Sequence, residues 1–133
     1  MRRLVAARGL TDHVDVDSAG TISYHVGDPA DSRMQLAARK RGYRLDSIAR
    51  QFHSDDFDYF DLILAMDRSN FKELRSLNPD LIYEDQLRLF GSFLPGDEDP
   101  DVPDPYYGGE RGFDEVLDMI EEACPRILDH VLG

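Results

Sequence analysis

Apolar residues recur at helical spacing over several stretches of the chain, and capping residues mark where these stretches begin and end. The last stretch, from Phe113 to Val131, is the longest and has one apolar face. Pro125 interrupts it, and the loss of one backbone hydrogen bond there should kink the helix near Glu121. The pattern predicts helices ending at Gly9, from Asp31 to Gly42, from Ser54 to Phe60, from Asp67 to Asn78-Pro79, and from Gly112 to Leu132.

Three further segments have the patterns of β-strands. His13 to Gly20 alternates apolar and acidic residues, which predicts a half-buried strand. Leu62 to Met66 is a continuous apolar run, typical of a strand covered on both faces in a parallel sheet. Gln86 to Phe93 is the third candidate. Strands that alternate with helices predict an α/β layer structure with a mainly parallel sheet, and no repeat or linker divides residues 1–133 into more than one domain.

Charge and composition narrow the possible partners. The 133 residues include 15 basic and 27 acidic ones, for a net charge of −12, which disfavours binding to nucleic acid or to an anionic membrane. The N-terminal residues contain no apolar region of signal-peptide length, and no stretch reaches the roughly 20 apolar residues of a membrane span. We therefore expect a cytoplasmic protein. A lone cysteine, Cys124, allows no internal disulfide.

The most informative segment runs from Asp101 to Gly109 and reads Asp-Val-Pro-Asp-Pro-Tyr-Tyr-Gly-Gly. Two prolines stiffen the backbone on either side of Asp104, and two tyrosines follow. A carboxyl group held on a rigid loop beside aromatic rings suits proton donation to a leaving group. A turn aspartate that bonds its own backbone is the alternative, and the residue types alone leave both open.

Other candidate chemistries fail on spacing. A Cys-x5-Arg loop at Cys124 would need arginine where the chain has His130, so Cys124 is predicted to be a core residue. A calcium loop starting at Asp97 would need glycine and glutamate where the chain has Val102 and Gly108. The histidines lack metal-ligand spacing and no serine lies in Gly-x-Ser-x-Gly, so neither a metal site nor a serine hydrolase is expected.

The chain resembles the low-molecular-weight protein tyrosine phosphatases. The resemblance rests on the loop around Asp104 and on further segments in the family's order and spacing: Val16–Thr21, Tyr24–Gly27, Asp31–Arg33, Ala49–Gln51, Asp61–Asp67 and Leu89–Phe93. It implies a three-layer α/β fold with a four-stranded, mainly parallel sheet of order 2-1-3-4. It also implies hydrolysis of a phosphotyrosine protein or a small aryl phosphate through a phosphocysteine, without metal or cofactor.

The resemblance also implies roles for individual residues. Asp104 would be the general acid that protonates the departing tyrosyl oxygen and then the base that activates water. Tyr24, Tyr106 and Tyr107 would line the groove for the substrate ring, and Ser18 would support the phosphate loop. Ser47 stands where many relatives carry histidine, so the role of that histidine has no counterpart here.

The family's nucleophilic Cys-x5-Arg-Ser/Thr loop, which follows its first strand, has no counterpart in the sequence. The helix that ends at Gly9 also has no capping residue before it, so we expect the chain to lack the central first strand and the loop, and to be inactive as given. A non-catalytic phosphotyrosine-binding, partner-binding or regulatory module is the alternative. An arsenate reductase of the same fold would need further cysteines, and Ser76 to Pro95 contains none.

Overall fold

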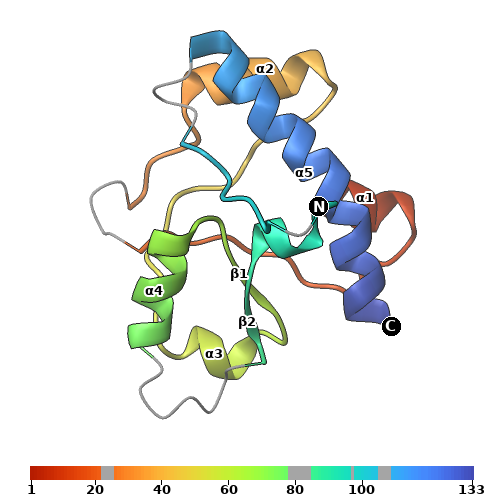
Figure 1. Ribbon diagram of the computed structural model, residues 1–133. Helices are drawn as coiled ribbons and strands as arrows, with labels where there is room; N and C mark the ends of the chain where they lie inside the picture. The colour runs from red at the N-terminus through yellow and green to blue at the C-terminus, as the bar shows by residue number, and fades with distance from the viewer. Residues whose placement is uncertain (22–25, 78–84, 97, 105–108) are drawn as a thin grey trace.

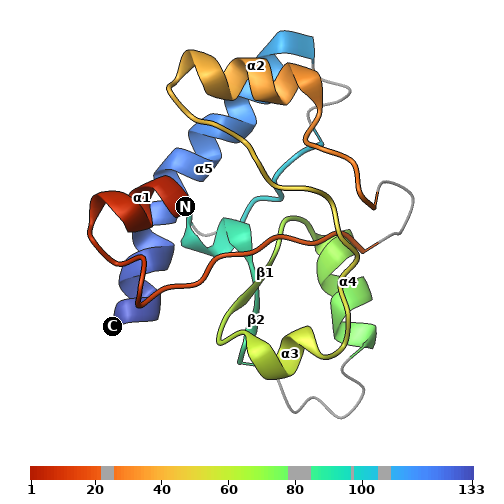
Figure 2. The ribbon, with the colours of Figure 1, turned by 180° about the vertical axis from the view of Figure 1, so that it is seen from behind.

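A computed structural model describes residues 1–21, 26–77, 85–96, 98–104 and 109–133 of the chain. These residues form an α/β structure in which helices surround a short parallel sheet (Figures 1 and 2). In chain order the elements are α1 (Arg2–Ala7), α2 (Ser32–Lys40), α3 (Asp56–Tyr59), β1 (Ile63–Ala65), α4 (Arg68–Ser76), β2 (Leu87–Leu89), the 3-10 helix η1 (Phe90–Phe93) and α5 (Gly109–Leu132).

The sheet explains why the run from Leu62 to Met66 is apolar throughout. β1 pairs in parallel with β2, with Ile63 opposite Leu87 and Ala65 opposite Leu89. Ile63 and Ala65 pack into a cluster with residues of α3 and α4, whereas Leu62 and Leu64 pack against a second cluster formed mainly by η1 and α5. Both faces of β1 are therefore covered, as predicted, and the helices form layers on either side of the sheet.

The predicted helix ends are confirmed where local chemistry determines them. Asp31 caps α2 by accepting a hydrogen bond of 2.8 Å from the amide of Arg33, and Asp67 caps α4 by accepting one of 2.7 Å from the amide of Asn70. Gly9 and Gly42 follow α1 and α2 with φ of 68° and 84°, the left-handed conformation that glycine adopts without strain. Asn78 and Pro79 lie outside the described residues.

The strand predicted from His13 to Gly20 is wrong. Val14 to Ala19 has no regular structure, and only Gly20 forms a bridge, a parallel one with Gln51. The alternation itself is correct, because Val14 and Val16 are half-buried while Asp15 and Asp17 are exposed. Within the described part of the chain no strand pairs with this segment, and the side chain of Arg2 binds the carbonyl of Val16 at 2.9 Å instead.

Two other boundaries also differ from the predictions. The segment from Gln86 to Phe93 is a strand only at Leu87–Leu89, and its second half turns into η1, which carries the chain away from the sheet. The last helix begins at Gly109, three residues before the predicted start, and continues through Pro125 to Leu132. The described residues of the chain therefore contain a two-stranded sheet and a long covering helix. None of the helices searched in them is long and apolar enough to cross a membrane.

Candidate active site

Asp104 lies on the segment that connects η1 to α5, shown in cyan in Figure 1, and its side chain is exposed. The backbone just before it is attached to the end of β1, because the amide of Val102 donates a hydrogen bond of 2.8 Å to the carbonyl of Met66. The side chain of Val102 is buried in the cluster that contains Phe90 and Leu94. Asp104 therefore follows a fixed point at the carboxyl end of a parallel strand, where α/β proteins commonly place their ligands.

The groove predicted to hold the substrate ring stays a prediction. Tyr24, Tyr106 and Tyr107 lie outside the described residues.

Ser18 is exposed and borders a hollow of about 290 Å³. Its own amide donates a hydrogen bond of 2.8 Å to Oδ1 of Asp17. Ser47 lies on the same hollow, and its hydroxyl accepts a hydrogen bond of 2.9 Å from Arg2. The remaining lining residues are mostly small: Ala19, Gly20, Asp28, Pro29, Ala30, Ile48 and Ala49. The structure thus brings Ser18 and Ser47 to the border of one cavity.

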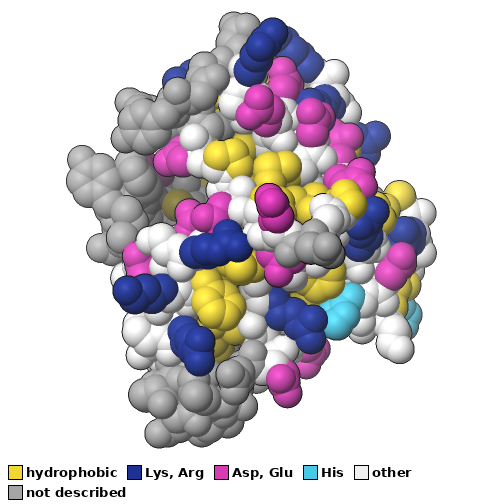
Figure 3. Space-filling view, viewed as in Figure 1, with side chains coloured by type: hydrophobic (Ala, Val, Ile, Leu, Met, Phe, Trp, Pro, Cys, Tyr) yellow, Lys and Arg dark blue, Asp and Glu magenta, His cyan; other side chains and the backbone are white. Residues whose placement is uncertain are grey.

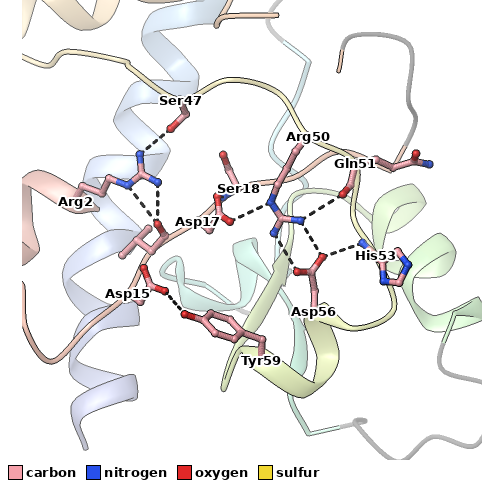
Figure 4. A network of polar contacts seen from close by, with 11 residues as sticks. Arg2, Asp15, Asp17, Ser18, Ser47, Arg50, Gln51, His53, Asp56 and Tyr59 are labelled. Atoms are coloured by element: carbon pink, nitrogen blue, oxygen red, sulfur yellow. Dashed lines mark hydrogen bonds and ion pairs between the residues drawn. The ribbon is translucent and has the colours of Figure 1, made fainter. Parts of the chain in front are cut away.

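A polar network fixes the chain next to this hollow (Figure 4). The guanidinium of Arg50 binds Asp17 at 3.0 Å and Asp56 at 3.0 and 3.2 Å, and so joins the extended segment to α3. Burial alone would raise the pKa of Asp56, but hydrogen bonds from Arg50 and from the amide of His53 outweigh it and lower that pKa below its usual value. The opposite carboxylates keep the pKa of Arg50 above its usual value, and Asp56 contributes most.

Sequence reasoning did not assign a role to Arg50. The available signal was weak, because Arg50 is one of five arginines between the segments His13 to Gly20 and Ser54 to Phe60. Such a residue is suited to join both segments by charge-assisted hydrogen bonds.

Cys124 is buried in the face of α5 that packs on the core, with 7% of its surface exposed, so the prediction of a core residue is confirmed. His130 packs edge-on against Phe93, with ring centroids 5.3 Å apart. No group of three His, Cys, Asp or Glu side chains in the described ranges could hold a metal ion.

The fold agrees with that of known proteins. The family model described as low molecular weight phosphotyrosine protein phosphatase matches residues 1–132. The chain therefore belongs to the low-molecular-weight protein tyrosine phosphatase family, and the resemblance seen in its sequence is confirmed.

Individual relatives extend over most of the chain. A protein of Synechocystis sp. named as a low molecular weight protein-tyrosine-phosphatase is 44% identical over 96% of this chain and 82% of the relative. The Streptomyces coelicolor low molecular weight protein-tyrosine-phosphatase is 42% identical over 96% of this chain and 79% of the relative. The crystal structure of an Entamoeba histolytica protein tyrosine phosphatase superposes with a TM-score of 0.90 at 42% identity, covering 98% of this chain and 83% of that one.

Proposed function

We propose that these residues form a single domain that supplies the acid loop and the substrate groove of a phosphotyrosine phosphatase. In this proposal Asp104 protonates the tyrosyl oxygen as the P–O bond breaks, and it then takes a proton from the water that attacks the phosphocysteine. The observation that carries the proposal is the position of Asp104. It is exposed and follows a backbone point bonded to the end of β1, in a chain whose family acts on phosphotyrosine.

The nucleophile must come from outside these 133 residues. The only cysteine is Cys124, which is buried and has no arginine six positions later, so it cannot form a Cys-x5-Arg phosphate loop. We infer that catalysis requires such a loop, and that the 133 residues alone are inactive. A strand that carried the loop would lie centrally in a four-stranded parallel sheet of order 2-1-3-4, of which β1 and β2 would be two members.

Tyr24, Tyr106 and Tyr107 would hold the ring of a phosphotyrosine protein or a small aryl phosphate. The loop-supporting role of Ser18 is favoured by its place with Ser47 on the border of a hollow of about 290 Å³. The proposed reaction uses no metal or other cofactor. The proposed domain is cytoplasmic, and its net charge of −12 disfavours binding to nucleic acid or to an anionic membrane.

One observation favours a second function for the chain as given. Because its only thiol is buried, it could retain the aromatic groove and bind phosphotyrosine segments or partner proteins without hydrolysing them. Such a non-catalytic module would bind phosphotyrosine but would not hydrolyse an aryl phosphate.

Hydrolysis of para-nitrophenyl phosphate separates the two functions. The 133-residue chain should show no turnover, because acid catalysis is worth about 10² to 10⁴ in rate and no nucleophile is present for it to assist. The same chain preceded by a strand and a Cys-x5-Arg loop should be active, and Cys124→Ser should leave that activity intact. Turnover by the 133 residues that disappears in Cys124→Ser would overturn the proposal, and inactivity of the extended chain would favour the binding module.

A further inference from the structure

An ion pair between Arg68 and Asp101 lies at the base of the segment that carries Asp104. Oδ1 of Asp101 accepts hydrogen bonds from Nη1 of Arg68 at 2.7 Å and from the backbone amide of Arg68 at 3.1 Å. Nη2 of the same arginine donates to the carbonyl of Glu98 at 3.1 Å. One residue at the start of α4 therefore holds two positions of a segment that lies 30 and 33 residues further along the chain.

The same segment is also held at Val102 and is packed closely at Pro100. The amide of Val102 binds the carbonyl of Met66 at 2.8 Å. Gly91 lies so close to Pro100 that a Cβ atom on the glycine would come within 1.9 Å of the carbonyl oxygen of Pro100. Only Pro103, whose φ is fixed by its ring, separates Val102 from Asp104. The backbone of Asp104 therefore has little freedom once residues 98–102 are in place.

The contacts of Arg68 are not needed to build α4. Asp67 already caps that helix through the amide of Asn70, and Leu74 anchors it in the core. The ion pair is also largely exposed, with 57% of the Arg68 side chain and 42% of the Asp101 side chain accessible. Exposed ion pairs add little to global stability, so this pair has its main effect on the local order of the segment.

We propose that Arg68 is a positioning residue for Asp104. Its guanidinium ties residues 98 and 101 to the start of α4, so that the carboxyl group of Asp104 occupies one place relative to the sheet. The pair also neutralises the charge of Asp101, which lies three residues before Asp104. The importance of this position for catalysis rests on the proposed function, in which Asp104 transfers the proton.

The test compares amide hydrogen exchange and carbon NMR in the 133-residue chain and in Arg68→Ala. Loss of a charge-assisted hydrogen bond should speed exchange of the Val102 amide by about tenfold. The side-chain carboxyl carbon signal of Asp104 should shift, while the amides of Ile63 and Leu128 and the melting temperature stay as they were. Lys72→Ala, which removes another exposed cation from α4, should change none of these quantities.

Conservative replacement provides the second arm of the experiment. Arg68→Lys keeps the charge but cannot bind Asp101 and Glu98 together as a guanidinium does, so it should restore only part of the protection of Val102. Unchanged exchange at Val102 in Arg68→Ala would overturn the proposal. So would an equal acceleration at Val102, Ile63 and Leu128, because that result means a general structural role. Neither measurement depends on turnover, so failure of the phosphatase function would be seen separately, in the assay above.

Discussion

The phenolic hydroxyl of Tyr59 donates a hydrogen bond of 2.9 Å to Oδ2 of Asp15, a residue 44 positions earlier in the chain. The bond joins α3 to the extended segment that leads to Ser18 (Figure 4). Because this segment forms no ladder with a strand of the described residues, side-chain bonds of this kind hold it in place.

The first prediction concerns the ionisation of Tyr59. The hydrogen bond to Asp15 and the negative charge of that carboxylate raise the pKa of Tyr59 above its usual value. The neutral phenol is therefore the favoured form, and its stabilising contribution is present below about pH 10 and lost as the pH rises through the raised pKa. Asp15→Asn should lower the pKa of Tyr59, measured by carbon NMR of the tyrosine rings. Tyr59→Phe identifies the signal, and an unchanged midpoint in Asp15→Asn would contradict the assignment of the cause.

The second prediction concerns Arg50 and acid stability. In the wild-type chain the lowered pKa of Asp56 contributes stability above about pH 4, and this contribution is lost as the pH falls through the lowered pKa. In Arg50→Gln burial dominates and raises that pKa, so the variant should be less stable at pH 7 by about 1 to 3 kcal/mol and the difference should shrink below about pH 4.

Urea unfolding at pH 7 and pH 3.5 would measure both effects. Arg44→Gln is the matched control, since its ion pair with Asp46 is formed by a side chain that is 88% exposed. A destabilisation in Arg50→Gln that is the same at both pH values would show that packing, rather than the charge of Asp56, carries the effect.

The two ends of α2 and the start of α4 could be predicted because short-range chemistry sets them. Asp31 and Asp67 each accept an amide hydrogen bond from a residue two or three positions later, and Gly42 needs only its own backbone freedom. The burial of Cys124 likewise followed from its place on the apolar face of α5. Each of these features is set by residues within a few positions of one another, so the local sequence is enough to predict it.

Strand formation and the site contacts depend on residues that are distant in the sequence. The alternation of Val14 and Val16 with acidic residues describes which side chains are half-buried, but it cannot say whether a partner strand is present. Arg68 binds Asp101, which lies 33 positions later, and nothing in either local sequence indicates the pair. The segment from Asp101 to Gly109 was singled out by its prolines and tyrosines, whereas the contact of Arg68 with Asp101 appears only in the fold.

The third prediction concerns Gly91, at the start of the 3-10 helix. A methyl group at this position would meet the carbonyl oxygen of Pro100 at 1.9 Å and its carbonyl carbon at 2.8 Å, both backbone atoms that cannot rotate away. Gly91→Ala should therefore destabilise the domain by about 1 to 3 kcal/mol, the range for overpacked sites, and displace residues 98–102. Thermal unfolding and exchange at Val102 would show both effects. Ser92→Ala, at the neighbouring exposed position, should show neither; a Gly91→Ala variant as stable as the wild type would mean that the two segments are further apart.

Charge is distributed unevenly between α4 and α5. Figure 3 shows acidic side chains gathered over α5 and basic ones over α4, on a chain with a net charge of −12. The phosphate of a substrate would meet less repulsion on the side of α4 than on the side of α5. Salt should therefore weaken any steering of an anionic substrate, since the Debye length is only about 8 Å at physiological ionic strength.

The last prediction concerns Asp104 itself, in the chain extended by a Cys-x5-Arg loop. Asp104→Asn should slow hydrolysis of phosphotyrosine much more than hydrolysis of an aryl phosphate with a low-pKa leaving group. A basic departing oxygen needs the proton most, while attack by the thiolate and binding of the phosphate are common to both substrates. The loss for phosphotyrosine should fall in the range of about 10² to 10⁴ that general acids supply.

The matched controls for this experiment are the two neighbouring tyrosines. Tyr106→Ala and Tyr107→Ala should raise KM for aromatic substrates with a smaller effect on kcat, because side chains that hold the ring act on ground state and transition state alike. If Asp104→Asn slowed both leaving groups equally, Asp104 would shape the loop rather than donate the proton. Asp101 would be a poor replacement, because Arg68 already occupies its carboxylate, so the acid would then have to be sought at Asp99.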